Sequence, residues 1–391
     1  MRYAVFVLFL CFMITGCATT NLPPVTKDSK FEEDEKRLWL RSEEEQKALN
    51  RSGIIYRDED LDAYLNGIAR KLQPPEVYAR IPFQVNVIKN NLLNAFAYPN
   101  GAIYVHTGIL ARMDNEAQLA TLLAHEMTHA THRHMIEQFR DVKNKTAFLA
   151  TLQVTTAGLG GYGSLAILLG TIGTVAAVTG YSREHEAEAD REGFRLMLNA
   201  GYDPTEAPKL FLHLKKEVEE EKTKEPFFFG THPRLTDRVE NYETLLKTHS
   251  QGHQESIQNT EIFLGKIRRV ILDNARDDLK AGRFKIAERG VEKYSKIESE
   301  SAEAYCLLGD IRRQRGEGND VETAKDHYQR AISINSSYPD SHKGIGLIHY
   351  KRKEKTLAKK ALELYLSLSP QASDRAFIEE YIHQCQEGGK E

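Results

Sequence analysis

The chain has 391 residues, 41% hydrophobic and 28% charged, which suits about two domains and excludes collagen-like, mucin-like and wholly disordered proteins. The 53 Lys and Arg residues nearly balance the 56 Asp and Glu residues, which gives a net charge of −3. The chain therefore lacks the excess of basic residues that is typical of nucleic-acid-binding proteins. Only four cysteines occur, which excludes a miniprotein built on disulfides.

The amino terminus has the pattern of a bacterial export signal. Arg2 supplies a positive charge, an apolar stretch follows at residues 4–13, and small residues precede Cys17. The stretch is too short to span a bilayer as a helix. The segment resembles a lipoprotein signal, in which Cys17 is lipidated and begins the mature chain; the alternative is an ordinary cleaved signal with an incidental cysteine. We predict a lipoprotein signal peptide at residues 1–16 and a tether at 17–30.

The resemblance to lipoproteins also predicts the compartment. Ala18, rather than Asp, stands at the second mature position, which in bacterial lipoproteins favours the outer membrane. A lipid-modified cysteine carries more than one acyl chain, as stable anchoring requires. We therefore expect a periplasmic protein that is anchored to the inner leaflet of the outer membrane.

Residues 31–250 are predicted to form one domain of the α+β class, in which helices outnumber strands. We expect helices at residues 31–50, 60–72 and 115–134, and strands at residues 83–87 and 102–106. Asp60 is the expected N-cap of the second helix. Pro99-Asn100-Gly101 is the expected turn before the second strand.

An uncharged segment separates this part of the domain from the next helix. Residues 146–182 contain no charged side chain, and seven glycines divide the segment into shorter apolar pieces. A membrane-spanning helix needs about 20 consecutive apolar residues, so we do not expect one. The favoured interpretation is a helical hairpin packed over the core or the active cleft. The alternative is an interfacial segment that touches lipid or an unfolded substrate.

The carboxy-terminal part, residues 251–391, is predicted to be an all-α domain of tetratricopeptide-like repeats. Small residues recur with a period near 34, and the spacing of 37 from Gly309 to Gly346 contains a three-residue insertion. We expect three units at about 268–370 and a capping helix to about 386. Cys306 and Cys385 fall in this part, where a disulfide between them and two free thiols are both open interpretations.

The sharpest motif of the sequence is His125-Glu126-x-x-His129. Histidines four residues apart lie on the same face of a helix, so both imidazoles can reach one zinc ion. Glu126 is placed to act as general base toward a water molecule at the metal. His132 and His134 continue this helix in the prediction, with His132 at its surface.

The third ligand is expected beyond the uncharged segment, because a catalytic zinc site usually has three protein ligands and an open position. Glu186 and Asp190 are four residues apart and share a helix face. Glu186 is the candidate ligand, and Asp190 is the candidate acceptor for the other nitrogen of a ligand imidazole. Glu184, His185 and Glu188 face elsewhere in this interpretation and are expected to be ordinary polar positions.

Further motifs accompany these two. Asn94-Ala95-Phe96-Ala97 lies upstream, and His232-Pro233 and Arg238 lie downstream. With this set of motifs the chain resembles the zinc peptidase family that includes HtpX and the CAAX prenyl proteases, and within it the BepA-like periplasmic members. The resemblance covers residues 45–245 as the catalytic domain, and the repeats extend it to nearly the whole mature chain.

The resemblance implies a gluzincin-type fold, one zinc ion per chain, and endoproteolysis of misfolded or stalled outer-membrane proteins. It implies that His125, His129 and Glu186 bind the zinc ion. In the same comparison, Glu126 is the catalytic base and Asp190 orients a ligand histidine.

The resemblance also implies roles for residues outside the two helices. Residues 94–97 would form an edge strand that pairs with an extended substrate. His232 would lie in a loop that closes over the metal, as a fourth ligand at rest or as a contact to the developing oxyanion; the alternative is an ordinary loop histidine before Pro233. Arg238 would hold that loop, or the helix of Glu186, by a charge-assisted contact.

Two function classes stay open at this point. The leading one is a membrane-tethered zinc endopeptidase whose repeats dock unfolded substrates or the outer-membrane assembly machinery. The alternative is a non-enzymatic adaptor or chaperone for outer-membrane protein assembly, with a latched or vestigial metal site. The sequence favours the enzyme because ligands, base and orienting carboxylate are all present.

Overall fold

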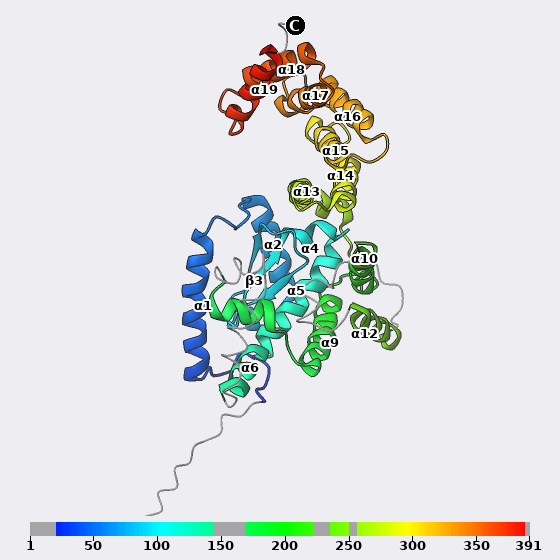
Figure 1. Ribbon diagram of the computed structural model, residues 1–391. Helices are drawn as coiled ribbons and strands as arrows, with labels where there is room; N and C mark the ends of the chain where they lie inside the picture. The colour runs from blue at the N-terminus through cyan, green and yellow to red at the C-terminus, as the bar shows by residue number, and fades with distance from the viewer. Residues whose placement is uncertain (1–20, 144–168, 222–234, 250–255, 388–391) are drawn as a thin grey trace, which may run out of the picture.

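The computed structural model describes residues 21–143, 169–221, 235–249 and 256–387, and it combines many helices with one small sheet (Figure 1). The mixed α+β class is therefore confirmed. Figure 1 shows a compact body around the sheet and an arc of paired helices that leads from this body to the carboxyl end. The predicted signal peptide, Cys17 and His232 lie outside the described residues.

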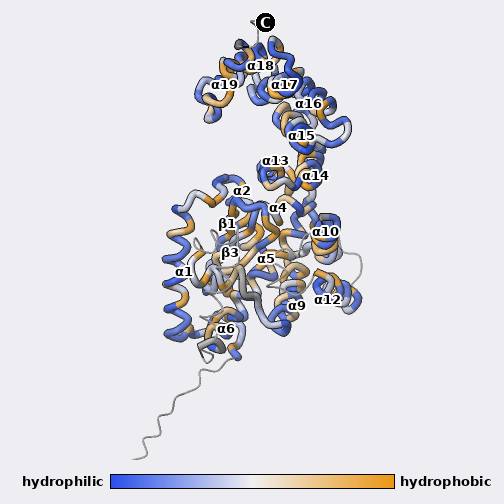
Figure 2. The backbone as a smooth tube through the Cα atoms, viewed as in Figure 1, coloured by the Kyte–Doolittle hydropathy of each residue, from blue (hydrophilic) through white to orange (hydrophobic). Residues whose placement is uncertain are grey.

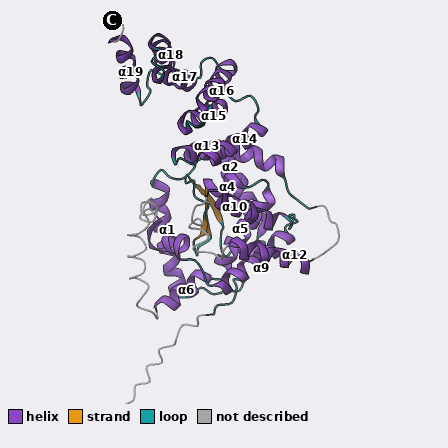
Figure 3. Ribbon diagram, turned by 45° about the vertical axis from the view of Figure 1, so that its right-hand side comes forward, coloured by secondary structure: helices purple, strands orange, loops and turns teal. Residues whose placement is uncertain are grey.

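The sheet lies inside a shell of helices (Figure 3). Its strands, in the spatial order β1-β3-β2, are β1 (Gln84–Ile88), β3 (Ala102–His106) and β2 (Ala95–Ala97). β1 pairs with β3 in parallel, and β2 pairs with β3 antiparallel. Because side chains alternate between the faces of a sheet, Val87 and Ala95 enter the main core, while Phe96 and Tyr104 enter a second apolar cluster. Both predicted strands are confirmed, the first beginning one residue later than expected.

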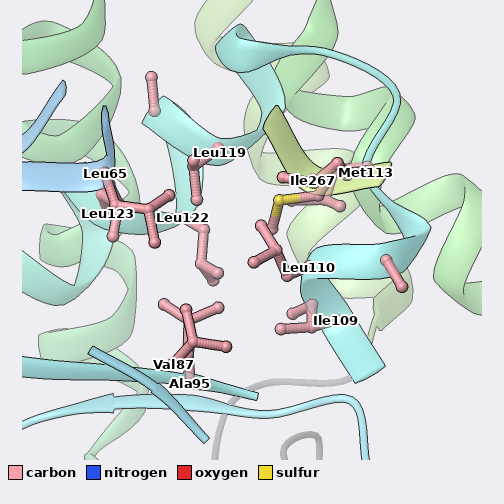
Figure 4. Packing of buried hydrophobic residues seen from close by; sticks show 14 of the residues in the cluster. Leu65, Val87, Ala95, Ile109, Leu110, Met113, Leu119, Leu122, Leu123 and Ile267 are labelled. Carbon is pink, nitrogen blue, oxygen red and sulfur yellow. The ribbon is translucent and has the colours of Figure 1, made fainter. Parts of the chain in front are cut away.

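α5 is the central helix of this body. The helical elements of the body are α1 (Glu33–Arg51), α2 (Glu59–Leu72), α3 (Pro75–Tyr78), α4 (Thr107–Arg112), α5 (Glu116–Thr131), α6 (His134–Lys143), the π-helical turn η1 (Val175–Thr179), α9 (Arg183–Asn199), α10 (Glu206–Glu221) and α12 (Leu235–Thr248). Every residue of α5 is buried. Leucines of α5 share one apolar cluster with Val87 and Ala95 of the sheet (Figure 4). Hydrophobic residues concentrate around α5, β1 and β3, whereas α1 is mostly hydrophilic (Figure 2).

Two predicted helix ends are wrong. α2 is capped by Asp58, whose side chain accepts a hydrogen bond from the backbone N–H of Leu61, and Asp60 lies inside the helix. α5 ends at Thr131, because Arg133 has a φ of +60°, and this left-handed conformation cannot continue a right-handed helix. His132 and His134 therefore do not extend α5, and His134 begins α6 instead.

The carboxy-terminal helices form three hairpins and a final helix, as the period predicted. They are α13 (Thr260–Lys280), α14 (Phe284–Ile297), α15 (Ala302–Arg315), α16 (Asp320–Ile334), α17 (Pro339–Lys351), α18 (Lys355–Leu368) and α19 (Arg375–Glu387). Gly309 allows α15 and α16 to pack closely, since a Cβ atom there would lie 2.5 Å from the Tyr328 ring. Cys306 and Cys385 are both free and buried, so the disulfide interpretation is wrong.

Of the predicted hairpin at residues 146–182, only residues 169–182 lie within the described part of the chain. Residues 169–174 are helical and lead into η1, which contacts β2. The Glu45 carboxylate of α1 fixes this segment by accepting hydrogen bonds from the backbone N–H groups of Thr171, Ile172 and Gly173. Across the described ranges, none of the helices combines the length and the apolar character that crossing a membrane requires.

Candidate metal centre

Two helices position the candidate ligands. α5 carries His125 and His129 one turn apart, and α9 packs directly against it. Gly193 of α9 permits this close approach, since a Cβ atom there would lie 3.0 Å from the backbone nitrogen of His125. Ser182 caps the first turn of α9 with its side chain. The beginning of α9 thus brings Glu186 to the face of α5 that holds the two histidines.

The three side chains meet in a buried cluster. The Nε2 atoms of His125 and His129 lie 3.0 Å apart. Glu186 places one carboxylate oxygen 3.4 Å from His125 Nε2 and the other 3.7 Å from His129 Nε2. All three side chains are at most 1% exposed, and one ligand atom of each lies within 4.8 Å of the others. Glu126, the residue after His125 on α5, is also 1% exposed. The cluster therefore offers two nitrogens and a carboxylate to one metal ion.

On the outer side of His125, a carboxylate and a guanidinium form a buried pair. Asp190 Oδ1 lies 3.1 Å from His125 Nδ1, and Arg238 of α12 donates to the same oxygen over 2.6 Å. Asn241 donates to the other oxygen over 3.2 Å. Burial alone would raise the pKa of Asp190, but the Arg238 guanidinium and the His125 ring hold it below its usual value. Asp190 is thus an ionised acceptor beside a candidate ligand, and Arg238 contacts the Glu186 helix through it.

The outer side of His129 faces an aromatic ring and another imidazole. The Tyr181 ring stacks on His129 with centroids 3.9 Å apart. Burial, with Glu126 and Glu186 nearby, raises the pKa of Tyr181 well above its usual value, so its phenol keeps the proton at neutral pH. His134 Nδ1 lies 2.8 Å from His129 Nδ1.

His134 belongs to a second polar group beside the cluster. Its Nε2 lies 3.2 Å from Glu188 Oε2, and its ring stacks on His185 with centroids 4.3 Å apart. His185 Nε2 in turn lies 2.8 Å from Glu137 Oε2. Burial and the neighbouring rings of His185 and His132 lower the pKa of His134 to about 2, so the ring is neutral at pH 7. His185 and Glu188 therefore have specific partners, contrary to the expectation of ordinary polar positions.

The predicted substrate strand lies at an edge of the sheet. β2 pairs with β3 on one side, and Asn94, Ala95, Phe96 and Ala97 are all buried. η1 contacts β2, and the Asn94 side-chain amide lies 3.5 Å from the carbonyl oxygen of Ala177. The strand is therefore partly covered by a segment of the same chain.

Sequence reasoning missed Tyr181 and His134 as neighbours of the cluster. Tyr181 stands directly before the Ser182 cap, so an aromatic residue beside a helix carrying Glu186 was the available signal. The sequence offered no comparable signal for His134, because in a continuous helix His134 would not face His129. The turn at Arg133, with its positive φ, brings it back.

Comparison with known proteins agrees with this geometry. Residues 56–246 match the family model for peptidase family M48. The β-barrel assembly-enhancing protease of Escherichia coli (strain K12) is 29% identical over 195 residues, which are 49% of this chain and 40% of that protein. The mitochondrial metalloendopeptidase OMA1 of Arabidopsis thaliana is 34% identical over 136 residues, 35% of this chain and 26% of that protein.

Among solved structures, the crystal structure of MamA covers 39% of this chain and 77% of its own, with 23% identity and a TM-score of 0.27, too low to support an argument about fold. The chain spans less than half of the length of the two curated relatives described above. The matched region nevertheless includes α5 and α9 with their cluster. Residues 56–246 belong to peptidase family M48, and the chain carries a BepA-like metallopeptidase domain of that family.

Proposed function

We propose that the protein is a zinc endopeptidase in which His125, His129 and Glu186 hold one zinc ion. The observation that carries the proposal is the spacing of the ligand atoms. Tetrahedral zinc with ligand atoms about 2.1 Å away separates those atoms from each other by about 3.4 Å. Here the two Nε2 atoms are 3.0 Å apart, and each lies near a different oxygen of the Glu186 carboxylate, at 3.4 Å from His125 and 3.7 Å from His129. Two imidazoles and one carboxylate are also a usual donor set for catalytic zinc.

The chemistry follows from the residues around this site. A zinc ion held by His125, His129 and Glu186 would polarise the scissile carbonyl and lower the pKa of a water molecule in the site. Glu126 takes the proton of the attacking water and passes it to the leaving amine. Asp190 accepts the Nδ1–H of His125, which fixes the hydrogen of that ring on Nδ1 and directs the lone pair of Nε2 toward the metal site. Arg238 keeps Asp190 ionised for this task.

The substrate is proposed to be an extended segment of an unfolded or misassembled outer-membrane protein. The lipoprotein-like signal with Cys17 supports a periplasmic, outer-membrane-anchored chain. The name of the Escherichia coli relative, a β-barrel assembly-enhancing protease, supports this substrate class. Residues 94–97 are proposed to pair with the extended substrate. His232 is proposed to act in a loop over the metal, and the repeats to dock substrate or the assembly machinery.

The decisive experiment compares wild type with Glu126→Gln. Both purified proteins are assayed for zinc content and for digestion of an unfolded porin. We expect about one zinc ion per chain in each, and cleavage by the wild type alone, because the amide cannot act as a base. A zinc-loaded wild type that never cuts, yet promotes porin assembly, would favour the non-enzymatic adaptor.

A second pair of variants, Glu186→Gln and Glu184→Gln, tests whether Glu186 is a zinc ligand. Glu186→Gln should bind zinc more weakly, because a neutral amide replaces a carboxylate ligand. Glu184→Gln removes a carboxylate two residues away, on the exposed side of the same helix, and should leave zinc binding unchanged. Equal zinc stoichiometry and affinity in the two variants would contradict the assignment.

A further inference from the structure

The two candidate ligand histidines are supported by different partners. A histidine that binds a metal through one nitrogen carries a hydrogen on the other nitrogen, and that N–H needs an acceptor. For His125 the acceptor is the carboxylate of Asp190, 3.1 Å from Nδ1. For His129, Nε2 points toward the cluster, and Nδ1 lies 2.8 Å from another ring nitrogen, Nδ1 of His134. An imidazole nitrogen accepts a hydrogen bond only when it carries no hydrogen itself.

The position of the ring hydrogen on His129 determines the position of the ring hydrogen on His134. Zinc binding at Nε2 of His129 leaves the hydrogen on its Nδ1. Nδ1 of His134 then has to be the acceptor, so the hydrogen of the His134 ring sits on Nε2. That Nε2 lies 3.2 Å from Glu188 Oε2, and an ionised carboxylate is an acceptor only. The geometry of the three side chains thus fits the tautomers in which His129 offers Nε2 to the metal.

The surrounding contacts hold His134 in the orientation this requires. Its side chain is 1% exposed. The His185 ring stacks on it at an interplanar angle of 9°, and His185 is itself held by Glu137 over 2.8 Å. The left-handed residue Arg133 ends α5 and turns the chain so that His134, five residues after His129, faces it. A continuous helix would not bring these two rings together.

We propose that His134 and Glu188 form a relay that fixes the metal-binding tautomer of His129. Glu188 accepts the Nε2–H of His134, and His134 accepts the Nδ1–H of His129, so both are positioning residues that act on zinc through His129. This inference rests on the proposed zinc site. It adds a carboxylate–histidine–histidine arrangement beside the carboxylate–histidine arrangement of Asp190 and His125.

The test measures the zinc dissociation constant by competition with a chelator, in the full-length protein. His134→Leu removes the acceptor and should weaken zinc binding by about 10- to 100-fold, the usual effect of losing the hydrogen-bond partner of a ligand. His134→Asn has nearly the same size as Leu but places a carbonyl oxygen close to the former Nδ1, and it should recover most of the affinity. Glu188→Leu should also weaken binding, and Glu192→Leu, one turn further along α9, should not.

Thermal unfolding of the metal-free variants separates the relay from a role in packing alone. We expect the Leu and Asn variants of His134 to unfold at similar temperatures without zinc and to differ in zinc affinity. If zinc binds the wild type and the Leu variant equally, or if Asn fails to recover affinity although it folds, the relay is wrong and the zinc site stands. If the wild type itself binds no zinc, both the proposed function and the relay are wrong.

Discussion

Arg238 is a fully buried cation that forms an ion pair with the buried carboxylate of Asp190. Its guanidinium donates to Asp190 over 2.6 Å and lies 4.3 Å from the centre of the Phe211 ring, with 0% of the side chain exposed. A buried ion pair contributes little net stability, because both ions lose their hydration. Removing one partner is different, since the other charge stays buried without compensation.

We therefore predict that Arg238→Met lowers the free energy of unfolding by about 3–5 kcal/mol. The measurement is urea unfolding of the metal-free protein. Arg330→Met is the matched control, because Arg330 lies 3.6 Å from Glu300 in a pair whose side chains are 50% and 76% exposed. An exposed pair of this kind is worth less than about 1 kcal/mol. If both variants lose a similar amount of unfolding free energy, burial does not make the Arg238–Asp190 pair more costly to break than an exposed pair.

His106 at the end of β3 is a buried imidazole. Within the described part of the chain neither ring nitrogen has a hydrogen-bond partner, and the side chain is 0% exposed. Burial lowers the pKa of His106 from its usual 6.5 to about 3. Between these two pH values the unfolded chain binds a proton that the folded chain does not bind. Stability must then fall as the pH falls from 6.5 toward 3.

His106→Leu should remove this pH dependence. Relative to the variant, the wild type should lose about 2 kcal/mol of unfolding free energy between pH 7 and pH 5. Urea unfolding at both pH values, with a chelator present to exclude metal effects, measures the difference. A gap between the two proteins that does not change with pH would mean that His106 has the same pKa in the folded and the unfolded chain.

At the residue scale, the sequence predicted pairs along one helix and missed contacts between elements. The spacing of His125 and His129 places both on one helix face, because side chains four residues apart are neighbours there. The approach of Tyr181 and His134 depends on a turn at Arg133 and on the path of a segment 50 residues later.

At the scale of elements, the distance between α5 and α9 sets the geometry of the cluster. α5 carries two of its side chains and α9 the third. Gly193 lies against the backbone of α5, where an added Cβ atom would be 3.0 Å from His125 N and 3.1 Å from Ala124 C. A backbone neighbour cannot rotate away as a side chain can, so a larger residue must push the helices apart by a few tenths of an ångström.

We predict that Gly193→Ala lowers proteolytic activity by about tenfold, since catalysis is sensitive to displacements of this size. Gly265→Ala in α13 is the matched control, because nothing lies within 4 Å of the atom it adds. That exchange should stabilise the protein by about 0.5–1 kcal/mol, as alanine favours a helix over glycine, with activity unchanged. The pair is compared by porin digestion and urea unfolding. Full activity of Gly193→Ala would show that the helices adjust without moving the cluster.

The elements that the sequence predicted well are those with a strong local pattern. Alternating apolar residues predicted β1 to within one residue, the turn at residues 99–101 predicted β3, and the periodic leucines predicted α5. The short helices α4 and α6 were missed, because α4 begins directly after β3 and α6 begins only three residues after the end of α5. The N-cap of α2 was assigned two residues late, since Asp58 and Asp60 are equally suitable by residue type.

At the scale of the whole molecule, the first repeat hairpin and the peptidase body share one apolar core. α13 contacts α4 and α2, and Ile267 of α13 joins the same cluster as Leu110 and Met113 (Figure 4). Polar contacts also join this hairpin to the body: Arg112 Nη2 of α4 lies 2.9 Å from Asp278 Oδ2 of α13, and Lys293 Nζ of α14 donates to the carbonyl oxygen of Met113 over 2.6 Å. The repeat period predicted the hairpins, but it carries no information on what their outer faces contact. The predicted domain boundary between residues 250 and 251 stays a prediction. The contacts described here connect the two predicted domains.

The shared core predicts that the body and α13 unfold together. Ile267→Ala should lower unfolding free energy by about 2–5 kcal/mol. Trp39, the single tryptophan of the chain, packs against this core in α1, so its fluorescence should report the loss. Ile348→Ala in α17 makes the same change in a separate repeat cluster and should leave the Trp39 transition in place, although circular dichroism detects unfolding of the repeats. A Trp39 transition that is insensitive to Ile267→Ala would mean that the body unfolds independently of α13.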